Sequence, residues 1–496
     1  MVSVWAFLVL GVYGLSLVYV TVYCLIQFDL LLHYLKKEPR SAQQDPQTNQ
    51  AILPFVTIQL PLYNEKYVVE RLLDAVAAMD YPTDRFEIHV LDDSTDETLE
   101  VVQAKVAHYR SKGIQIAQIT RSDRTGYKAG ALRDALPLAK GDFVAIFDAD
   151  FLPDPGFLRQ TLPHFQDPTT GVVQTRWEHL NEDYSLITQM QALQLNVHFT
   201  IEQTGRMKGG YLLQFNGTAG VWRKSCIADA GGWEADTLTE DLDLSIRAQL
   251  KGWKIVYLEG VGSPAELPAE MNSFRSQQFR WMKGGAETTR KMLPAIWSAD
   301  LGWWKKLQAT VHLLGSSVFL FVFLLGVSSV PLLFALDELS TLGFSKEKFA
   351  WFLTGLVSIG SIYFVGNVGA SYPEERLGRR ILRFLFRFPL FLSLSMGMAL
   401  HNTVAILEGY RGKKSAFVRT PKFNIRGTAD KLSANSYTRH RIAITSYLEA
   451  LLSLCFLAAF IAGVAMGETT FLIFHAMLAF GYGFIFYFTI RHIRLK

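Results

Sequence analysis

The sequence predicts a doubly wound α/β domain with a mostly parallel sheet, inserted between membrane-spanning α-helices. Three observations support this fold class. Apolar stretches long enough to cross a bilayer stand near both ends of the 496-residue chain. Between them, short β-branched runs alternate with amphipathic stretches, which is the pattern of a parallel sheet covered by helices. Polar motifs follow these runs at their carboxyl ends, where such sheets bind ligands.

The composition fits this mixed architecture. Half of the residues are apolar and 19% are charged, which is too apolar for an ordinary soluble enzyme and too charged for a pure membrane bundle. The net charge of +4 is modest, and no nucleic-acid partner is expected. Cys24, Cys226 and Cys455 show no metal-ligand spacing, so we interpret them as free thiols.

The first apolar run, from about Val4 to Ile26, predicts a membrane helix within residues 1–33. It lacks a basic start and a small-residue cleavage site, so an uncleaved anchor is favoured over a signal peptide. Basic residues follow it (His33, Lys36, Lys37 and Arg40), which by the positive-inside tendency places the next domain in the cytosol. Residues 34–51, with the polar stretch Pro39–Gln50, are predicted to be a linker, and residues 52–304 the cytosolic domain.

Four runs in the cytosolic domain predict parallel strands: Phe55–Leu62, Phe86–Leu91, Ile114–Thr120 and Phe143–Phe147. The stretches between them predict helices: Val68–Met79, Glu97–Arg110 and Lys128–Ala139. Neither a G-x-G-x-x-G fingerprint nor a P-loop signature accompanies these strands, so the sequence argues against dinucleotide and ATP binding.

The strand ends carry candidate ligands for a charged substrate. Asp148 and Asp150 end the fourth strand, where two carboxylates aimed at one point suit Mg²⁺ or Mn²⁺ holding a diphosphate. Tyr63-Asn64-Glu65 follows the first strand. Asp92–Asp96 follows the second and suits helix capping as well as ligand binding. Lys128 begins a helix and is either a phosphate contact or a solvated lysine.

Three later motifs complete the candidate site. The small-residue loop Phe215–Gly220, with Asn216 and Gly217, lets a bulky ligand approach the backbone. Thr239-Glu240-Asp241 either caps a helix or supplies a carboxylate that takes a proton from an attacking hydroxyl. In Gln277–Trp281, Arg280 offers a cation for phosphate and Trp281 an apolar face for a sugar ring. A tryptophan belt at headgroup depth is the alternative interpretation.

Five further apolar stretches follow: about Leu313–Leu336, Phe349–Ala370, Ile381–Leu407, Tyr447–Met466 and Thr469–Ile490. If all of them crossed, the basic loop Arg411–Arg441 and the basic tail Arg491–Lys496 would lie outside. Ile381–Leu407 contains Arg383, Arg387, Pro389, His401 and Asn402, which suits an interfacial or re-entrant helix. We therefore predict two membrane helices in residues 305–370, an interfacial helix in 371–410, a cytosolic loop in 411–443, and two helices with a tail in 444–496.

The stretch from Leu60 to Met282 resembles the processive membrane glycosyltransferases of family 2, the cellulose synthase superfamily. The closest resemblance is to the cellulose synthase-like A and C branches, which make mannan, glucomannan and β-1,4-glucan backbones. The resembling segments are Val90–Asp96, Phe143–Phe151, Val173–Trp177, His198–Gln203, Phe215–Arg223 and Gln277–Trp281. Phe151 replaces the histidine that follows the D-x-D in bacterial cellulose synthases, and control through an attached cyclic-di-GMP domain is not expected.

This resemblance implies a GT-A fold and a nucleotide-diphosphosugar donor, with UDP-glucose and GDP-mannose favoured. The implied nucleoside contacts are Tyr63, Glu65 and Asp93. The implied metal ligands are Asp148 and Asp150, with Lys128 near the diphosphate. Asp241 would be the general base beside Glu240, and Gln277, Arg280 and Trp281 would hold the diphosphate and the acceptor. Residues 417–422 resemble a gating loop, with Phe417, Thr420 and Lys422 at its motif positions.

The implied activity is an inverting, metal-dependent transferase that extends a β-linked polysaccharide and translocates it. The alternative is a lipid glycosyltransferase that adds one sugar to ceramide, diacylglycerol or a polyprenyl carrier. An inactive binding protein is disfavoured, since every carboxylate that a catalyst needs is in place. The expected partners are the donor, a glycan or lipid acceptor, the bilayer and accessory export proteins. The expected location is the inner (plasma) membrane, or the Golgi membrane in a eukaryote.

Overall fold

The computed structural model describes residues 4–36, 53–344, 353–369, 375–428, 430 and 443–493. Several sequence predictions fall on residues outside these ranges. They are the linker Pro39–Gln50, the first residues of the Phe349–Ala370 stretch, most of the second half of the Arg411–Arg441 loop and the last three residues of the basic tail.

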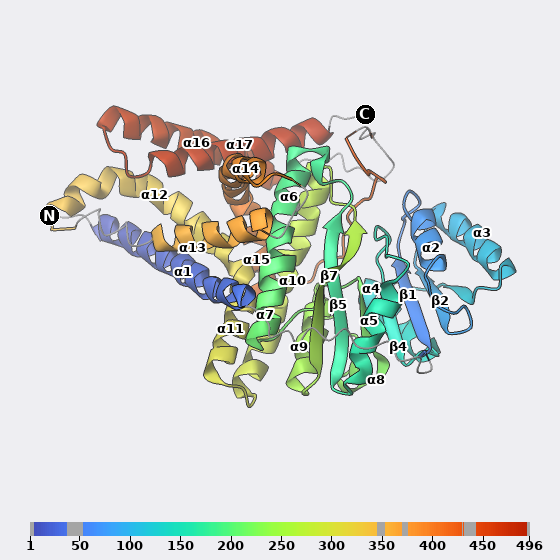
Figure 1. Cartoon of the computed structure of the whole chain (residues 1–496). Helices are drawn as coiled ribbons and strands as arrows, with labels where there is room; N and C mark the ends of the chain where they lie inside the picture. The colour runs from blue at the N-terminus through green and yellow to red at the C-terminus, as the bar shows by residue number, and fades with distance from the viewer. Residues whose placement is uncertain are drawn as a thin grey trace.

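A seven-stranded sheet forms the centre of the domain at the right of Figure 1, in the order β3-β2-β1-β4-β6-β5-β7. The strands are β1 Val56–Leu62, β2 Phe86–Asp92, β3 Ile116–Ile119, β4 Phe143–Ile146, β5 Thr170–His179, β6 Gly220–Arg223 and β7 Lys254–Ala265. Strand β6 runs antiparallel to β4 and β5, and the other neighbouring pairs are parallel. The predicted mostly parallel sheet is confirmed.

The central strands are buried on both faces, which explains their nearly continuous apolar sequences. Every residue of β2 is buried, as is all of β1 except the half-buried Pro61. The register sets Leu62 opposite Asp92, and Gln59 opposite Ile146. The polar segments that follow β1, β2 and β4 therefore emerge at the same edge of the sheet.

Helices cover the sheet and connect its strands (Figure 1). The helices of this domain are α2 Val69–Ala77, α3 Thr98–Ser111, α4 Tyr127–Ala135, α5 Phe157–Thr161, α6 Leu186–Val197, α7 Gln203–Gly209, α8 Lys224–Asp229, α9 Glu240–Leu250 and α10 Met271–Ser298. A π-helical turn, His198–Glu202, joins α6 to α7. The first three helices match the predicted amphipathic stretches within a few residues.

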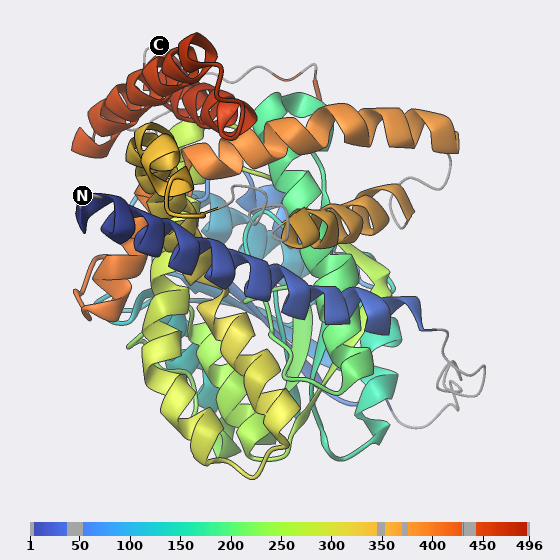
Figure 2. The same cartoon turned by 90° about the vertical axis from the view of Figure 1, so that its left-hand side faces the viewer.

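Apolar helices gather on one side of the sheet domain and face the viewer in Figure 2. They are α1 Val4–Leu35, α11 Trp303–Leu313, α12 Val318–Ser340, α13 Leu353–Phe364, α14 Leu377–Gly397, α15 Ala399–Tyr410, α16 Ile444–Met466 and α17 Leu472–Ile493. Within the described ranges, four segments are long and apolar enough to cross a membrane, namely α1, α11–α12, α16 and α17. The chain is therefore a multi-pass membrane protein.

The predicted Ile381–Leu407 segment is two helices, because α14 and α15 meet at a 49° bend. Arginines such as Arg379 and Arg383 line α14, while Leu385 and Phe386 are exposed on it. This amphipathic composition fits a helix lying in the membrane interface. The crossing of the bilayer by α13, and the interfacial position of the α14–α15 pair, stay predictions.

Glycines bring α14 and α17 into backbone contact. A Cβ at Gly481 would collide with the Ser393 carbonyl oxygen, and a Cβ at Gly397 would collide with the Gly481 backbone. Small residues allow this close approach, from which membrane helices gain packing contacts. By contrast, no atom lies within 4 Å of a Cβ built at Gly11 in α1.

Gly481→Ala is expected to separate α14 from α17 and to cost about 1–3 kcal/mol, as overpacking of a close-packed contact does. The measurement is the thermal unfolding midpoint of the purified protein in detergent, compared with the matched control Gly11→Ala. We expect a lower midpoint for Gly481→Ala and no loss for Gly11→Ala. Equal midpoints for the two variants would contradict the contact.

Candidate active site

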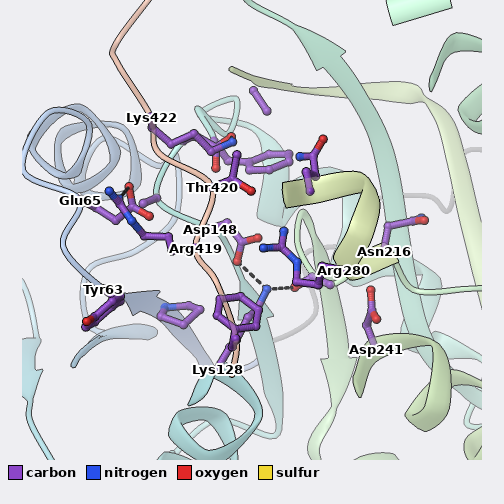
Figure 3. Close-up of a pocket in the computed structure, with 18 of the residues that line it drawn as sticks. Tyr63, Glu65, Lys128, Asp148, Asn216, Asp241, Arg280, Arg419, Thr420 and Lys422 are labelled. Atoms are coloured by element: carbon purple, nitrogen blue, oxygen red, sulfur yellow. Dashed lines mark hydrogen bonds and ion pairs between the residues drawn. The ribbon is translucent and has the colours of Figure 1, made fainter. Parts of the chain in front are cut away.

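Each candidate motif contributes at least one residue to a single cavity at the carboxyl edge of the sheet, here called the sheet-edge cavity (Figure 3). The predicted site residues that line it are Tyr63, Glu65, Asp93, Lys128, Asp148, Asp150, Asn216, Gly217, Glu240, Asp241, Gln277, Arg280, Trp281, Phe417, Thr420 and Lys422. Its walls come from the ends of β1, β2 and β4, the start of α4, the loop before β6, and helices α9 and α10. Residues 417–422, which follow α15 in the chain, close one side. We call residues 417–424 the strap.

The two carboxylates of the D-x-D are each paired with a lysine. Asp148 Oδ1 accepts a hydrogen bond from Lys128 Nζ at 2.6 Å, and Asp150 Oδ2 accepts one from Lys422 Nζ at 2.5 Å. Lys128 also donates to the Gly217 carbonyl at 2.9 Å. Burial by itself lowers the pKa of Lys128, but the Asp148 and Glu240 carboxylates outweigh it and raise that pKa. Lys128 is therefore a cation.

The D-x-D fits a divalent metal. Its donors are two carboxylates, the oxygen ligands that Mg²⁺ and Mn²⁺ prefer. The Asp148 side chain remains 36% exposed in the cavity wall. The Thr218 hydroxyl accepts a hydrogen bond from the Asp148 backbone N–H at 2.8 Å and so fixes this strand end.

Another acidic cluster in the described part of the chain is already neutralised by a lysine side chain. Glu234, Asp236 and Asp243 have oxygens close enough together to hold an ion. Lys291 Nζ lies 2.5, 2.9 and 3.1 Å from these three carboxylates, in that order. The lysine supplies the positive charge that this cluster needs.

Glu240 and Asp241 begin α9 and face the cavity. Thr239 does not cap the helix through its side chain, because its hydroxyl bonds to the Thr288 hydroxyl at 3.0 Å. Burial, together with the neighbouring Glu240 carboxylate, raises the pKa of Asp241 to about 7. A carboxyl group that titrates near neutral pH is suited to proton transfer.

Helix α10 places its Q-x-x-R-W motif across the cavity. Arg280 donates to the Val418 carbonyl at 3.1 Å and lies 4.8 Å from the Phe417 ring centroid. Burial lowers the pKa of Arg280, and the Asp148 and Glu240 carboxylates oppose this effect. Trp281 lines the cavity. The exposed tryptophans on or near the apolar helices are Trp5, Trp297, Trp303 and Trp304.

The strap is docked on the cavity through its predicted motif residues. Phe417 stacks on Tyr127 with ring centroids 5.7 Å apart, and Thr420 is buried. Arg419 Nη1 lies 2.7 Å from Glu65 Oε2. Burial raises the pKa of Glu65 to about 7, although Arg419 acts in the opposite direction.

Two arginines that the sequence motifs did not reveal contact the predicted nucleoside-binding residues Tyr63 and Asp93. The Arg124 guanidinium lies 3.2 Å from the Tyr63 ring centroid, which is a cation–π stack. Arg121 binds both oxygens of Asp93, at 2.5 and 3.0 Å. Asp92 is buried and accepts a hydrogen bond from the Ser94 N–H at 3.0 Å, so its role is structural.

Sequence reasoning missed further cavity residues, among them Trp177, His179, Glu266 and Arg419. Trp177 and Arg419 lie inside segments that resemble the family, so sequence reasoning could have identified these two residues. Glu266 lies just after β7 and has no recognisable spacing from any motif. Its proximity to the strap depends on contacts between distant parts of the chain.

A second cavity, here called the helix-bundle cavity, adjoins the first. Its walls come from α1, the α6–α7 region, α11, α12, α13 and α14. Residues that line both cavities are Trp177, Leu195, Asn216, Thr239, Asp241 and Trp281. Asp241 and Trp281 therefore stand where the sheet-edge cavity meets the space between the apolar helices.

Polar groups form a belt in the wall of the helix-bundle cavity. His198 is held between Glu202 Oε2 and Asn216 Oδ1, each at 2.9 Å. Five buried polar atoms in this wall have no hydrogen-bond partner among the described residues: Gln27 Oε1, Trp177 Nε1, Arg206 Nε, His312 Nε2 and Ser316 Oγ. Buried polar groups are rarely left unpaired, so the belt is suited to a ligand that both donates and accepts hydrogen bonds.

Comparison with known families identifies the class of protein. A family model described as glycosyltransferase like family 2 matches residues 54–284. The chain is also 37% identical over 414 residues to a probable glucomannan 4-beta-mannosyltransferase 9 of Oryza sativa subsp. japonica, covering 81% of this chain and 74% of that one. The chain belongs to the family 2 glycosyltransferases.

Its similar relatives include glucomannan 4-beta-mannosyltransferase 1 of the same rice, at 44% identity over 270 residues. That match covers 53% of this chain and 52% of the relative, so it spans about half the length of that enzyme. A solved structure of a mannosyltransferase from Pyrobaculum calidifontis, in complex with GDP-Man and Mn²⁺, is 20% identical. It has a TM-score of 0.53 and covers 74% of this chain and all of that one, which supports the GT-A fold.

Acid is expected to loosen the strap. The Glu65 carboxylate that pairs with Arg419 is ionised above a pH of about 7 and is protonated below it, so the ion pair is lost as the pH falls through that value. A spin label at the exposed Ala416 would report this, in a Cys455→Ser background that leaves only buried cysteines. We expect label mobility to rise with acid in this protein and to be independent of pH in its Glu65→Gln variant. Label mobility that does not change with pH in the protein that retains Glu65 would contradict the prediction.

Proposed function

We propose that this protein transfers mannose from GDP-mannose to the end of a β-1,4-linked mannan or glucomannan chain and feeds that chain into the membrane. The observation that carries the proposal is the place of Asp241, which lines both the sheet-edge cavity and the helix-bundle cavity. The names of the relatives favour mannose as the transferred sugar. UDP-glucose is the second donor to test.

The D-x-D and its neighbours would hold the donor. Asp148 and Asp150 would bind Mg²⁺ or Mn²⁺, which when bound neutralises the charge of the diphosphate. Lys128 and Arg280 supply fixed positive charge beside it. Tyr63, Glu65 and Asp93 would hold the nucleoside. The strap residues Phe417 and Thr420 would lie against it.

Asp241 would act as the general base, with Glu240 beside it. It takes the proton from the acceptor hydroxyl as that oxygen bonds to the anomeric carbon from the face opposite the diphosphate. The bond from the anomeric carbon to the diphosphate oxygen breaks, and the diphosphate leaves with both electrons. One displacement converts the α-linked donor into a β-linkage. Gln277 and Trp281 would hold the sugar that carries the attacking hydroxyl.

The helix-bundle cavity supports a glycan acceptor over a lipid. Its belt combines hydrogen-bond donors such as Arg206 Nε with acceptors such as Gln27 Oε1. Sugar hydroxyls match both kinds of group, whereas a hydrocarbon tail matches neither. Aromatic rings at Trp177 and Trp281 add apolar faces suited to sugar rings. Asn216 and Gly217 would border the acceptor where the two cavities meet.

A location in the membrane follows from the apolar helices. We propose that residues 52–304 and the strap face the cytosol, where nucleotide sugars are made, and that α13, α16 and α17 cross the bilayer with α1 and α12. The α14–α15 pair would lie at the interface. Accessory export proteins are further candidate partners, and the plasma membrane or the Golgi membrane is the expected site.

The donor and product are tested together. Purified protein, radiolabelled GDP-mannose and Mn²⁺ are expected to give an ethanol-insoluble product that a β-mannanase digests. Asp150→Ala is the matched control, which should fold and give no product because a metal ligand is lost. A product that dissolves in organic solvent and carries a single sugar would refute the polymerase. If the protein incorporated sugar from UDP-glucose but not from GDP-mannose, the proposal that GDP-mannose is the donor would be refuted.

The base assignment predicts a pH profile. Since the pKa of Asp241 is about 7, its basic form is lost as the pH falls, and kcat is expected to fall below a pH of about 7. Asp241→Asn should keep donor affinity and lose turnover by about 10²–10⁴-fold, the usual contribution of a general base. Asp229→Asn, at an exposed site on α8, is the control and should keep both. Near-normal turnover of Asp241→Asn would disprove the assignment.

A further inference from the structure

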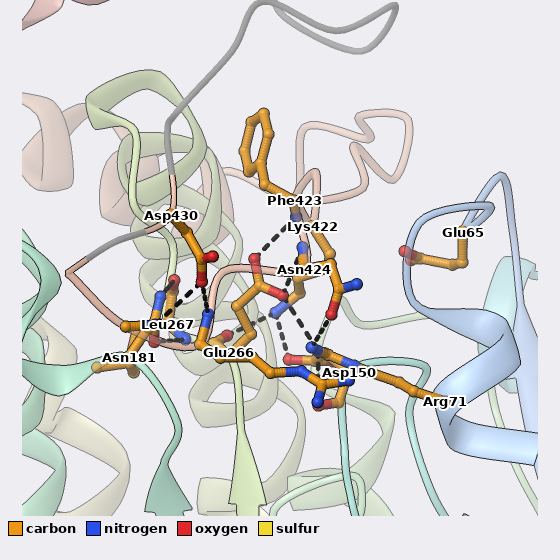
Figure 4. A network of polar contacts seen from close by, with 12 residues as sticks. Glu65, Arg71, Asp150, Asn181, Glu266, Leu267, Lys422, Phe423, Asn424 and Asp430 are labelled. Carbon is orange, nitrogen blue, oxygen red and sulfur yellow. Dashed lines mark hydrogen bonds and ion pairs between the residues drawn. The ribbon is translucent and has the colours of Figure 1, made fainter. Parts of the chain in front are cut away.

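The strap is anchored by a carboxylate that no motif identifies. Glu266 follows β7, and its side chain is 1% exposed. Its Oε1 accepts a hydrogen bond from the Phe423 N–H at 2.8 Å, and its Oε2 accepts one from the Asn424 N–H at 3.0 Å (Figure 4). Burial raises the pKa of Glu266, although Lys422 and the hydrogen bond from the Phe423 N–H act in the opposite direction. One side chain thus fixes two successive peptide groups of the strap.

The anchor is itself held rigidly. Arg71 of α2 donates to Glu266 Oε2 at 3.1 Å and to the Asn424 side-chain oxygen at 2.6 Å. Asn181 exchanges two hydrogen bonds with the Leu267 backbone, at 2.8 and 2.9 Å, and so fixes the residue next to Glu266. Asn424 has a φ of 60°, which turns the strap at the docked position.

This anchor determines where Lys422 lies. Lys422 directly precedes the two anchored peptide groups, and its Nζ donates to the Glu266 carbonyl at 3.1 Å. The same Nζ lies 2.5 Å from Asp150 Oδ2, and both side chains are almost buried, at 11% and 9% exposure. Arg71 completes the network by donating to the Asp150 carbonyl at 3.3 Å. The Lys422 ammonium group therefore supplies the positive charge that compensates Asp150, the second carboxylate of the D-x-D.

We propose that Glu266 is a positioning residue that holds Lys422 on Asp150 as a resident counter-ion, so that a divalent metal must displace Lys422 in order to bind. The Lys422 ammonium group lies against Asp150 Oδ2, so a metal on the same carboxylate would be repelled by its positive charge, and the two cations compete. In the resting protein Lys422 keeps the buried Asp150 charge compensated, which avoids the cost of an unpaired buried carboxylate. A bound metal would free Lys422, which lines the cavity proposed to hold the donor diphosphate, and would so link metal binding to donor binding.

The inference rests on the proposed metal site at Asp148 and Asp150, and its test needs no transfer reaction. Mn²⁺ affinity is measured on the full-length protein in detergent, without nucleotide, from the electron paramagnetic resonance signal of the free ion. Lys422→Ala is expected to bind Mn²⁺ about tenfold more tightly, the lower end of what a hydrogen bond between charged groups contributes. Damage to the fold would weaken binding, so a gain in affinity is specific to competition.

Glu266→Gln tests the anchor separately. The amide keeps the volume but loses the charge and one of the two acceptor oxygens, so Lys422 should leave Asp150 more readily and Mn²⁺ should bind more tightly than to the wild type. The matched control is Lys414→Ala, which removes a cation from the same loop that contacts the Asp236 carbonyl instead. Lys414→Ala and Lys422→Arg are expected to keep the wild-type affinity.

Three outcomes would overturn the proposal. One is an unchanged or weaker Mn²⁺ affinity of Lys422→Ala. Another is the same tight binding when Asp150→Asn is added to Lys422→Ala, since the metal would then lie elsewhere. An absence of Mn²⁺ binding to every variant would overturn both this inference and the proposed metal site. By contrast, tighter binding by Lys422→Ala in a protein that does not use GDP-mannose would refute only the proposed donor.

Discussion

A concentration of buried and half-buried carboxylates at one edge of the sheet is the constraint on which the rest of the structure depends. Five acidic side chains line the sheet-edge cavity within a few residues of the ends of β1 and β4 and the start of α9: Glu65, Asp148, Asp150, Glu240 and Asp241. Carboxylates removed from water tend to protonate unless cations compensate them. The compensating cations come from distant parts of the chain: Lys128 from α4, Arg280 from α10, and Arg419 and Lys422 from the strap. The pairing therefore holds together segments that are far apart in sequence.

Helix α10 connects this charge cluster to the membrane helices. At its start, the Met271 N–H donates to His492 Nδ1 of α17 at 3.0 Å. One turn later Arg275 pairs with the fully buried Glu449 of α16 at 2.5 Å. Lys283, which is also fully buried, bonds to Glu408 of α15 and to Ser415 just before the strap. A shift of the membrane helices would therefore move Arg280 and Trp281, which lie between these anchors.

The sequence anticipated much of the sheet and most of the candidate site. The strands β1–β4 lie within a residue or two of the predicted runs, since burial on both faces leaves a continuous apolar sequence. It did not anticipate the Arg124 stack on Tyr63, the Arg121 contacts with Asp93 or the Glu266 anchor. Single charged residues in loops have no periodicity, so their partners become evident only when distant loops come together.

Local sequence determined the strands, the apolar helix lengths and the presence of acids at strand ends, because these features follow from periodicity and burial over a few residues. Local sequence also indicated the protein family, through the D-x-D and Q-x-x-R-W motifs. Only the tertiary structure decided that Lys128 and Lys422 neutralise Asp148 and Asp150, and that Asp241 stands where two cavities meet. The physical reason is that a buried charge is stabilised by whichever opposite charge the whole fold brings within hydrogen-bonding distance, and no local spacing encodes that choice.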